Sequence, residues 1–293
     1  MPAIALRNPH FRLFAGAFLI SFSPVFVRLV TVSPTASGFY RTLIGGGALL
    51  LYLALAPGRR WPPPAIWLPL FAAAIFFALD LWFWHRSILL IGPGLATLIA
   101  NLQVFFMITA GVLFFKEKPT PVQVIAAPLA IAGLTLIVGA DWFELATGFR
   151  AGIVLGLLTA MSYAGYLLSM RRARRNAQST VPAVEVATVS LLVAGILGLA
   201  ALAEGSSLAI PTIGDFGWLM AYGVLAHACG LMLIASGLTE VTAAEVGIAL
   251  LLQPALSLLW DVLFFARSLS VIEAVGVIVT LIAIFLGAQR RAP

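Results

Sequence analysis

The sequence predicts an all-α membrane protein with ten transmembrane helices, arranged as two inverted five-helix repeats with both termini in the cytoplasm. Three observations predict this fold class: an apolar composition, ten apolar stretches of membrane-spanning length, and a motif that recurs at a constant offset. Hydrophobic residues make up 62% of the chain and charged residues only 10%, whereas about a quarter of the residues of a soluble domain are charged. The chain is too apolar throughout to be a soluble domain with one anchor, and an integral membrane protein is expected.

Each predicted span depends on its length and on the breakers that flank it. A helix needs about 20 mostly apolar residues to cross the hydrocarbon core. Ten stretches meet this requirement, and short connections with breakers such as Ser33-Pro34 and Gly92-Pro93-Gly94 separate them. The predicted spans cover residues 11–31, 34–56, 64–90, 93–115, 120–140, 150–170, 181–203, 215–238, 241–265 and 269–288.

A recurring motif indicates that the chain is one unit written twice. Leu102-Gln103 recurs as Leu252-Gln253, and the run from Val112 to Phe115 recurs from Val262 to Phe265. Both matches have an offset of 150 residues, with no gap between them. The shared register of the two matches favours duplication over chance.

The duplication predicts one transmembrane domain with two halves, repeat one at residues 1–145 and repeat two at residues 146–293. Each half contains five spans, an odd number, so the second half enters the membrane in the opposite sense to the first. Inverted repeats of this kind are a recurrent plan of secondary transporters, whose substrate site lies near the bilayer midplane between the halves. The sequence therefore predicts transport by alternating access.

Basic residues predict the orientation, because Lys and Arg near span ends are retained on the cytoplasmic side. With the amino terminus inside, twelve of the 17 basic residues lie at cytoplasmic span ends. These are Arg7, Arg12, Arg59, Arg60, Lys116, Lys118, Arg171, Arg172, Arg174, Arg175, Arg290 and Arg291. Asp141, Glu144, Glu204 and Asp215 fall in outer connections. The first apolar run is long and lacks a clear small-x-small cleavage site, so we expect an uncleaved span in the inner membrane.

Gln103 and Gln253 lie near the middle of the fourth and ninth predicted spans, at the same position of the two copies. Because these spans run in opposite directions, the two amides are expected at the same depth. A glutamine at the bilayer centre needs partners, and polar side chains there usually face protein or a wet cavity. The amides either bind a substrate or form hydrogen bonds between helices.

His227 lies near the middle of the eighth span, and the offset of 150 relates it to Phe77 in the third. Histidine changes charge near physiological pH, which suits a proton carrier or a substrate contact. The alternative is a neutral imidazole that forms a hydrogen bond to a neighbouring helix. In the third span, the spacing of Phe77, Asp80 and Trp84 predicts that they share one helix face, whereas His85 points elsewhere.

Asp80 is the most costly residue of the chain, because a carboxylate inside a span opposes membrane insertion. Arg41 in the second span and Asp80 in the third lie about equally far from the outer ends of their spans, so their depths are expected to coincide. One hypothesis is an ion pair between Arg41 and Asp80 that holds the first half together. The rival hypothesis is that Asp80 titrates and couples transport to protons.

Aromatic residues and prolines add to the predicted site. The rings of Tyr163 and Tyr166, in the sixth span, either contact an apolar substrate group or pack between helices. Pro24 in the first span is expected to kink it, and Pro128 and Pro254 to do likewise in the fifth and ninth spans. Together with the residues above, the predicted substrate contacts are Gln103, Gln253, His227, Trp84, Tyr163 and Asp80.

The sequence argues against several other classes of function. It contains no Gly-x-Ser-x-Gly, no His-Glu-x-x-His and no phosphate loop. With three histidines and one cysteine, no tight metal site and no cofactor are expected. The net charge of +6 comes from basic residues in short runs between apolar stretches, so it sets topology and does not indicate nucleic-acid binding.

Several short motifs resemble the drug/metabolite transporter superfamily of EamA type, whose members have ten spans in two five-span halves. The resemblance is carried by Phe39-Tyr40-Arg41, by the stretch from Trp84 to Ala96, and by Phe115-Lys116-Glu117-Lys118, which is similar to the family's Gly-Glu-Arg/Lys ending. Gln253-Pro254 matches the family's proline in the ninth span.

The chain departs from the family pattern at two places. The second copy ends in Phe265-Ala266-Arg267-Ser268, without the glutamate, and Gln103-Val104 of the first copy lacks the proline. Within the superfamily the chain is similar to YddG-like amino-acid exporters. That resemblance implies export of neutral or aromatic amino acids through a central cavity between the halves.

The expected function is export of amino acids or similar small metabolites across the inner membrane. The expected partners are a small-molecule substrate and the lipid bilayer, and the protein acts as a monomer or a homodimer. One alternative is a multidrug or other metabolite permease of the same superfamily. Another is a membrane enzyme that acts on a lipid-linked substrate.

Overall fold

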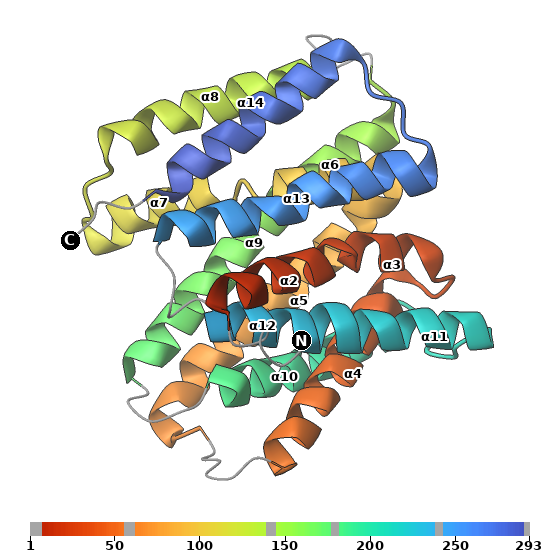
Figure 1. The fold of residues 1–293 in the computed structure, drawn as a ribbon. Coiled ribbons are helices and arrows are strands. Elements are labelled where there is room, and N and C mark those ends of the chain that lie inside the picture. The colour runs from red at the N-terminus through yellow and green to blue at the C-terminus, as the bar shows by residue number, and fades with distance from the viewer. Residues whose placement is uncertain (1–7, 56–61, 139–144, 177–181, 238–242, 290–293) are drawn as a thin grey trace.

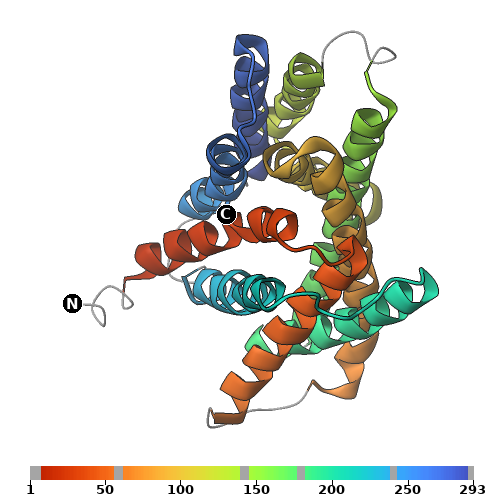
Figure 2. The same ribbon diagram turned by 90° about the vertical axis from the view of Figure 1, so that its right-hand side faces the viewer.

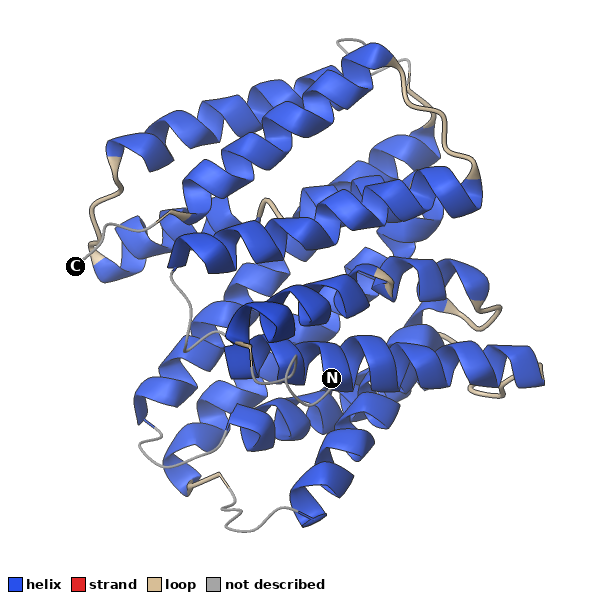
Figure 3. Cartoon of the chain, in the orientation of Figure 1, coloured by secondary structure: helices blue, strands red, loops and turns tan. Residues whose placement is uncertain are grey.

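The computed structural model describes residues 8–55, 62–138, 145–176, 182–237 and 243–289. Throughout these ranges the regular structure is helical, and no strand occurs in them (Figure 3). Of the residues used to predict the topology, Arg7, Arg59, Arg60, Asp141, Glu144, Arg290 and Arg291 lie outside the described residues, as does the side chain of Arg175.

The described helices form ten spans, several of them built from two or three consecutive helices (Figure 1). In chain order they are α2 (Pro9–Ser21) with α3 (Ser23–Leu29), α4 (Pro34–Leu55), η1 (Pro64–Ile66) with α5 (Trp67–Ile91), α6 (Pro93–Ala100) with α7 (Gln103–Phe115), α8 (Pro121–Val138), α9 (Thr147–Asn176), α10 (Pro182–Ala203), α11 (Ile213–Ala221) with η3 (Tyr222–Cys229) and α12 (Gly230–Gly237), α13 (Ala243–Phe265), and α14 (Val271–Ala288). In the described ranges, 9 of these spans are long and apolar enough to cross a membrane, and α13 adds a shorter apolar helix over Ala249–Phe265. The predicted ten-helix membrane fold is confirmed.

Local sequence signals explain most helix ends. Prolines begin α2, α4, α6, α8 and α10. At a helix start the backbone N–H has no partner within the helix, so the missing N–H of proline costs no hydrogen bond. The side chain of Asn8 caps α2 by accepting a hydrogen bond from the His10 amide. Ser270 and Glu273 form a capping box at the start of α14. These caps lie in the short connections where the sequence predicted breaks.

The fourth span of each repeat ends in the same backbone conformation. Lys116 after α7 and Ala266 after α13 both have left-handed backbones, with φ of 54° and 51°. At both ends the next amide folds back onto the helix, from Glu117 to the Gly111 carbonyl at 3.0 Å and from Arg267 to the Asp261 carbonyl at 3.3 Å. All of these pairs are 150 residues apart. The offset of the sequence motif therefore holds in the backbone as well.

Contacts between the spans follow an inverted two-fold pattern. α2 packs mainly on α12 and α5 on α9, while α4 packs on α10, α6 on α13 and α8 on α14. If each span is exchanged for its counterpart in the other repeat, the α2–α12 pair becomes the α5–α9 pair. The α4–α10, α6–α13 and α8–α14 pairs stay unchanged. The α8–α14 pair lies side by side at one edge of the bundle in both views (Figures 1 and 2). The boundary at residue 145 stays a prediction.

Glycines bring the backbones of paired helices close together. A Cβ atom added to Gly276 would lie 2.7 Å from the Gly133 carbonyl oxygen, at the crossing of α8 and α14. A Cβ atom on Gly16 would lie 2.8 Å from the Gly230 carbonyl oxygen, at the crossing of α2 and α12. Small residues permit this close packing between membrane helices. The pairing of spans thus follows from particular glycine positions.

One expectation about an individual span requires correction. α9 continues to Asn176 instead of ending near residue 170, because apolarity defines the part of a helix inside the membrane and not where its backbone hydrogen bonds stop. Pro128 and Pro254 lie inside α8 and α13, and the kinks expected at these prolines stay predictions. Only Pro24 accompanies an interruption, since α2 stops at Ser21 and α3 begins at Ser23.

Candidate functional site

A cavity of about 240 Å³ lies between the two repeats, with walls from both. Repeat one contributes residues of its first four spans, and repeat two contributes residues of its first, third and fourth spans. Its polar lining consists of Ser23, Arg41, Asp80, Thr97, Asn101, Gln103, Thr159, Gln253 and Ser257, together with the rings of Trp84, Tyr163 and Tyr166. Such a position between inverted repeats is where secondary transporters bind substrate.

The two glutamines of the duplicated motif both line this cavity. Gln103 is the first residue of α7, directly after the turn at Asn101 and Leu102 that separates α6 from α7. Gln253 lies inside α13, next to Pro254. The two amides thus face a common space, while their equal depth and their contact with substrate stay predictions.

One face of α5 forms an aromatic and acidic wall of the cavity. Phe77, Asp80 and Trp84 all line it, as their spacing predicted. The Phe77 ring stacks on Tyr166, with centroids 4.7 Å apart, and Tyr166 in turn lies 5.4 Å from the Tyr163 ring. α9 therefore places two tyrosines against the third span at the level of Asp80.

Arg41 and Asp80 do not form the predicted ion pair. Within the described part of the chain, no nitrogen of Arg41 lies within 4.0 Å of an Asp80 oxygen. The Arg41 guanidinium instead donates from Nε to His227 Nδ1 at 3.3 Å and from Nη1 to the Tyr222 hydroxyl at 3.0 Å. Both residues line one cavity, and their equal depth stays a prediction. Depth did not reveal the partners, because these come from the eighth span.

A π-helical segment brings both partners to Arg41. Tyr222 and His227 are five residues apart in η3, and residues five apart in an α-helix point in directions that differ by roughly 140°. A π-helix joins residue i to i+5 by hydrogen bonds, so these two residues lie about one turn apart. Each has 0% exposure. The wide turn is what allows a single helix to present both side chains to one guanidinium.

The hydrogen bonds behind Arg41 form a network in which each group donates in the direction away from the guanidinium. Because His227 Nδ1 accepts from Arg41, its Nε2 carries the proton and donates to Ser190 Oγ at 2.8 Å. Tyr222 donates to His85 Nε2 at 3.2 Å, and His85 Nδ1 donates to the Leu81 carbonyl at 2.6 Å. These assignments come from the hydrogen-bond partners. Both imidazoles are neutral in this arrangement, and the network fixes the guanidinium in one position.

His227 lies behind the cavity wall and not in it. Its ring has 0% exposure and is absent from the lining. Its repeat counterpart Phe77 does line the cavity, and the two rings stack with centroids 6.2 Å apart. The expectation of direct substrate contact is corrected for His227, because Arg41 stands between the imidazole and the cavity. The other five predicted contacts line the cavity.

The cavity is closed at the end opposite the termini by contacts between α6 and α13. The Asp261 carboxylate accepts a hydrogen bond from the Gly94 amide at 3.0 Å and pairs with Arg267 at 3.6 Å. Arg267 also donates to the Ile91 carbonyl at 2.7 Å. Gly92 has φ of 87°, and a Cβ atom there would lie 2.6 Å from Asp261 Oδ2. A glycine is therefore required where α5 turns into α6 against this carboxylate.

The first span joins the same closure from the other side of α13. Trp260 Nε1 donates to Ser21 Oγ at 2.9 Å, and Ser257 Oγ donates to the Ser21 carbonyl at 3.1 Å. The Phe22 ring stacks on Trp260 with centroids 4.6 Å apart. These contacts lie at the interruption between α2 and α3. The outer half of α13 is thus fixed to spans of repeat one on two sides.

A cluster around Glu204 ties together three spans at this outer end. Its carboxylate accepts from Trp82 Nε1 at 2.6 Å, Thr35 Oγ1 at 2.7 Å and Arg86 Nη2 at 3.0 Å. Burial opposes the charge of Glu204, but hydrogen bonds from Trp82 and Thr35 and the positive charge of Arg86 outweigh it and lower the pKa of Glu204. The carboxylate is therefore ionised at neutral pH.

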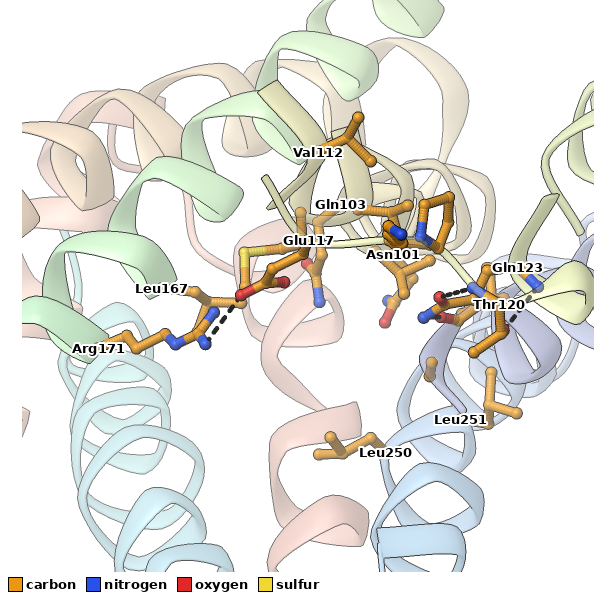
Figure 4. Close-up of a pocket in the computed structure, with 18 residues that line it drawn as sticks. Asn101, Gln103, Val112, Glu117, Thr120, Gln123, Leu167, Arg171, Leu250 and Leu251 are labelled. Atoms are coloured by element: carbon orange, nitrogen blue, oxygen red, sulfur yellow. Dashed lines mark hydrogen bonds and ion pairs between the residues drawn. The ribbon is translucent and has the colours of Figure 1, made fainter. Parts of the chain in front are cut away.

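At the end where the termini lie, a vestibule of about 520 Å³ adjoins the cavity (Figure 4). Asn101, Gln103, Leu167 and Leu250 line both spaces, so the two adjoin each other. Glu117 and Arg171 border the vestibule and form an ion pair at 3.1 Å. That contact joins the turn after α7 to the end of α9. It confirms that the basic residues of this turn and those at the end of α9 lie at the same end of the bundle.

Four polar residues of the cavity were missed from the sequence: Thr97, Asn101, Thr159 and Ser257. Asn101 could have been found by the argument used for Gln103, since a carboxamide within a span requires partners. The two threonines give no such signal, because each satisfies its hydroxyl with the carbonyl four residues earlier in its own helix. Across the described residues no group of three His, Cys, Asp or Glu side chains is arranged to hold a metal ion.

Ten apolar helices in inverted repeats, with a polar cavity between the halves, define the class of multi-pass membrane transporters. The chain belongs to the EamA-like transporter family, whose model matches residues 9–139 and 150–288. The two matched segments correspond to the two repeats. The predicted membership of the EamA type is confirmed, and it identifies a transporter and not an enzyme.

Comparison with known proteins shows a similar sequence and a similar structure. The uncharacterized transporter YwfM of Bacillus subtilis (strain 168) is 27% identical over 256 residues, which cover 84% of this chain and 81% of that protein. A known crystal structure has a TM-score of 0.66 at 20% identity and covers 95% of this chain and 97% of the other. At this identity the structural likeness shows the fold alone. The similarity to YddG-like exporters stays a prediction.

Proposed function

We propose that the protein exports amino acids, neutral or aromatic, and similar small metabolites across the inner membrane by alternating access. The observation that supports this most strongly is the polar and aromatic cavity between the repeats, which adjoins a vestibule at one end. Its walls offer amides, a guanidinium, a carboxyl group and four aromatic rings within one small space. Those groups suit a small solute with a polar head and an apolar side chain.

The size of the cavity favours a small solute over a drug. Its volume is about 240 Å³, whereas pockets for drug-sized ligands occupy about 300–1,000 Å³. A carboxylate and a guanidinium also face this space, and both would remain unpaired against a wholly apolar compound. Amino-acid export is therefore preferred here to a multidrug permease.

The inverted repeat supports alternating access as the mechanism. In such proteins the two halves exchange conformations around a fixed central site. The structure has a vestibule at the end of the termini and tight contacts at the opposite end. If the termini are cytoplasmic, as the basic residues predict, this conformation faces inward and receives substrate from the cytoplasm.

Counterflow in liposomes tests the proposed function. The purified protein would be reconstituted into vesicles loaded with unlabelled leucine or phenylalanine, and entry of the radiolabelled amino acid would be measured. We expect entry well above that of protein-free vesicles, and repetition with a pH gradient reports proton coupling. Transport of cationic dyes without transport of amino acids would favour the multidrug alternative. Chemical conversion of a lipid-linked substrate without net movement would favour the enzyme.

A further inference from the structure

A guanidinium and a carboxyl group face the central cavity without pairing with each other. Arg41 has 7% exposure and Asp80 has 6%, and both line the cavity. Among the described residues Asp80 accepts no hydrogen bond and forms no ion pair. Ionising a buried carboxyl group that has no partner costs free energy because the charge loses its hydration. An incoming solute that pairs with the carboxylate would remove this cost.

Arg41 is also only partly satisfied by the protein. Its Nε and one Nη1 hydrogen bind His227 and Tyr222, whereas a guanidinium has five N–H donors. Its Cζ atom lies 5.6 Å from the centroid of the Trp84 ring and 6.0 Å from that of Phe77, both in the cavity wall. The remaining donors border the space that Asp80 borders. Planar donors of this kind bind a carboxylate in two-point geometry.

We propose that Arg41 and Asp80 form a recognition site for zwitterions, with the substrate carboxylate on Arg41 and the substrate ammonium on Asp80. This rests on the proposed amino-acid export and names the chemical class that the cavity selects. A zwitterion neutralises both buried charges at once, whereas a simple acid or amine leaves one unpaired. Because Tyr222 and His227 hold the guanidinium in place, the site is rigid at the carboxylate end. The side chain of the solute then faces Trp84 and Tyr163.

Three ligands with one carbon skeleton test this assignment. Leucine has both charged groups, leucinamide has only the ammonium, and 4-methylpentanoate has only the carboxylate. Each would compete against radiolabelled leucine in counterflow, and each would be measured for binding to the purified protein by calorimetry. For the wild type we expect leucine to bind about tenfold or more tightly than either analogue, since each charged hydrogen bond contributes at least that factor.

Variants separate the two ends of the site. Asp80→Asn is expected to weaken the binding of leucine and leucinamide about tenfold and to leave the binding of 4-methylpentanoate unchanged. Arg41→Gln is expected to weaken the binding of leucine and 4-methylpentanoate and to leave the binding of leucinamide unchanged. Glu204→Gln is the matched control, because it removes a carboxylate that does not line the cavity. That control should keep the wild-type ranking of the ligands.

Different outcomes overturn different claims. Wild-type protein that transports leucine but binds all three ligands equally would overturn the zwitterion site and leave amino-acid export standing. Equal weakening of all three ligands by both variants would likewise assign the pair a purely structural role. A wild type that moves no amino acid would overturn the proposed function and the site together. If a variant fails to fold, the order in which the wild type binds the three ligands still tests the zwitterion site.

Discussion

The two ends of the bundle contrast in how the fourth and ninth spans are held. At the outer end, α13 is tied to α6 through Asp261 and Gly94 and to the first span through Trp260 and Ser21. At the end of the termini, the equivalent turn after α7 borders a vestibule of about 520 Å³. One closed end and one open end are what alternating access requires of a single conformation.

Equivalent positions of the two repeats explain part of this contrast. The guanidinium of Arg28 lies 5.1 Å from the Phe265 centroid at the outer end, and that of Arg171 lies 5.7 Å from the Phe115 centroid at the other end. A contact between an arginine and the last phenylalanine of the span is therefore present at both ends. At the position of Asp261, however, the first repeat has Gly111, since the two differ by 150 residues. Asp261 is thus a carboxylate that only the second repeat has at this position, and it contributes to the outer closure together with the contact between Trp260 and Ser21.

The largest effect is expected from Gly94→Ala, which breaks the closed end sterically. A Cβ atom at Gly94 would lie 2.6 Å from Leu258 Cα, a backbone atom that cannot rotate away. Overpacking of this kind costs about 1–3 kcal/mol, and we expect transport to fall by about tenfold or more. Counterflow and thermal unfolding would measure it. Gly47→Ala is the matched control, because nothing lies within 4 Å of its added Cβ atom.

Unchanged transport in Gly94→Ala would mean that α6 and α13 separate there without consequence. The contrast between the two ends would then have no effect on transport. Reduced transport in the Gly47→Ala control would instead assign the effect to glycine loss in general.

The second largest effect is expected from Asp261→Ala, which removes the carboxylate that the first repeat lacks. The Gly94 amide and Arg267 lose an acceptor at this partly buried site, which costs about 1–3 kcal/mol. We expect a lower unfolding temperature and faster labelling of a Ser257→Cys probe from outside the cell. Asp261→Asn should have a smaller effect, since an amide oxygen can still accept from Gly94. Equal labelling with and without Asp261 would contradict its role in closure.

A smaller, directional effect is expected from a matched pair of arginine variants. Arg28→Gln removes a cation–π contact at the closed end, and Arg171→Gln removes its counterpart at the open end. Each contact contributes about 0.5–1 kcal/mol. Only Arg28→Gln is expected to increase outside labelling, by a few-fold, because the other end is already open. Increased outside labelling in Arg171→Gln would show that the two ends are not independent.

The smallest effect is expected from acidification at the outer end. The pKa of Glu204 is lowered below its ordinary value of 4.5. The stability that Glu204 contributes is therefore present above that value and is lost as the pH falls through the lower folded value. Unfolding of wild type and Glu204→Gln should differ at pH 7 and converge in the acidic range below pH 4.5. A difference that persists unchanged throughout this range would contradict the assignment.

Much of the fold could be predicted because the relevant signals are local. Apolar runs between prolines and glycines gave the spans, and the motif that relates Gln103 to Gln253 gave the inverted repeat. The face of Phe77, Asp80 and Trp84 also followed from helix periodicity. The spans and this face depend only on neighbours within a few turns of one helix, and the repeat follows from comparing two stretches of sequence, so no knowledge of tertiary packing was needed.

The partners of Arg41 could not be predicted, because they depend on packing and on an irregular backbone. Depth alone favoured Asp80, which lies in the next span. Tyr222 and His227 reach Arg41 from the eighth span, and only a π-helical turn points both toward it. No periodicity of α-helical type contains that information. The closure by Asp261 was likewise hidden, since it requires knowledge of which spans meet outside.

The π-helical turn of η3 also has a consequence for insertions and deletions. A wide turn of this kind accommodates a residue more than an α-helix of the same height would. Deleting one residue between Tyr222 and His227 would leave the two residues four apart, a spacing that an ordinary α-helical turn keeps on one face. The deletion would instead shift the register of one half of the span against the other, and with it the faces that pack on neighbouring helices.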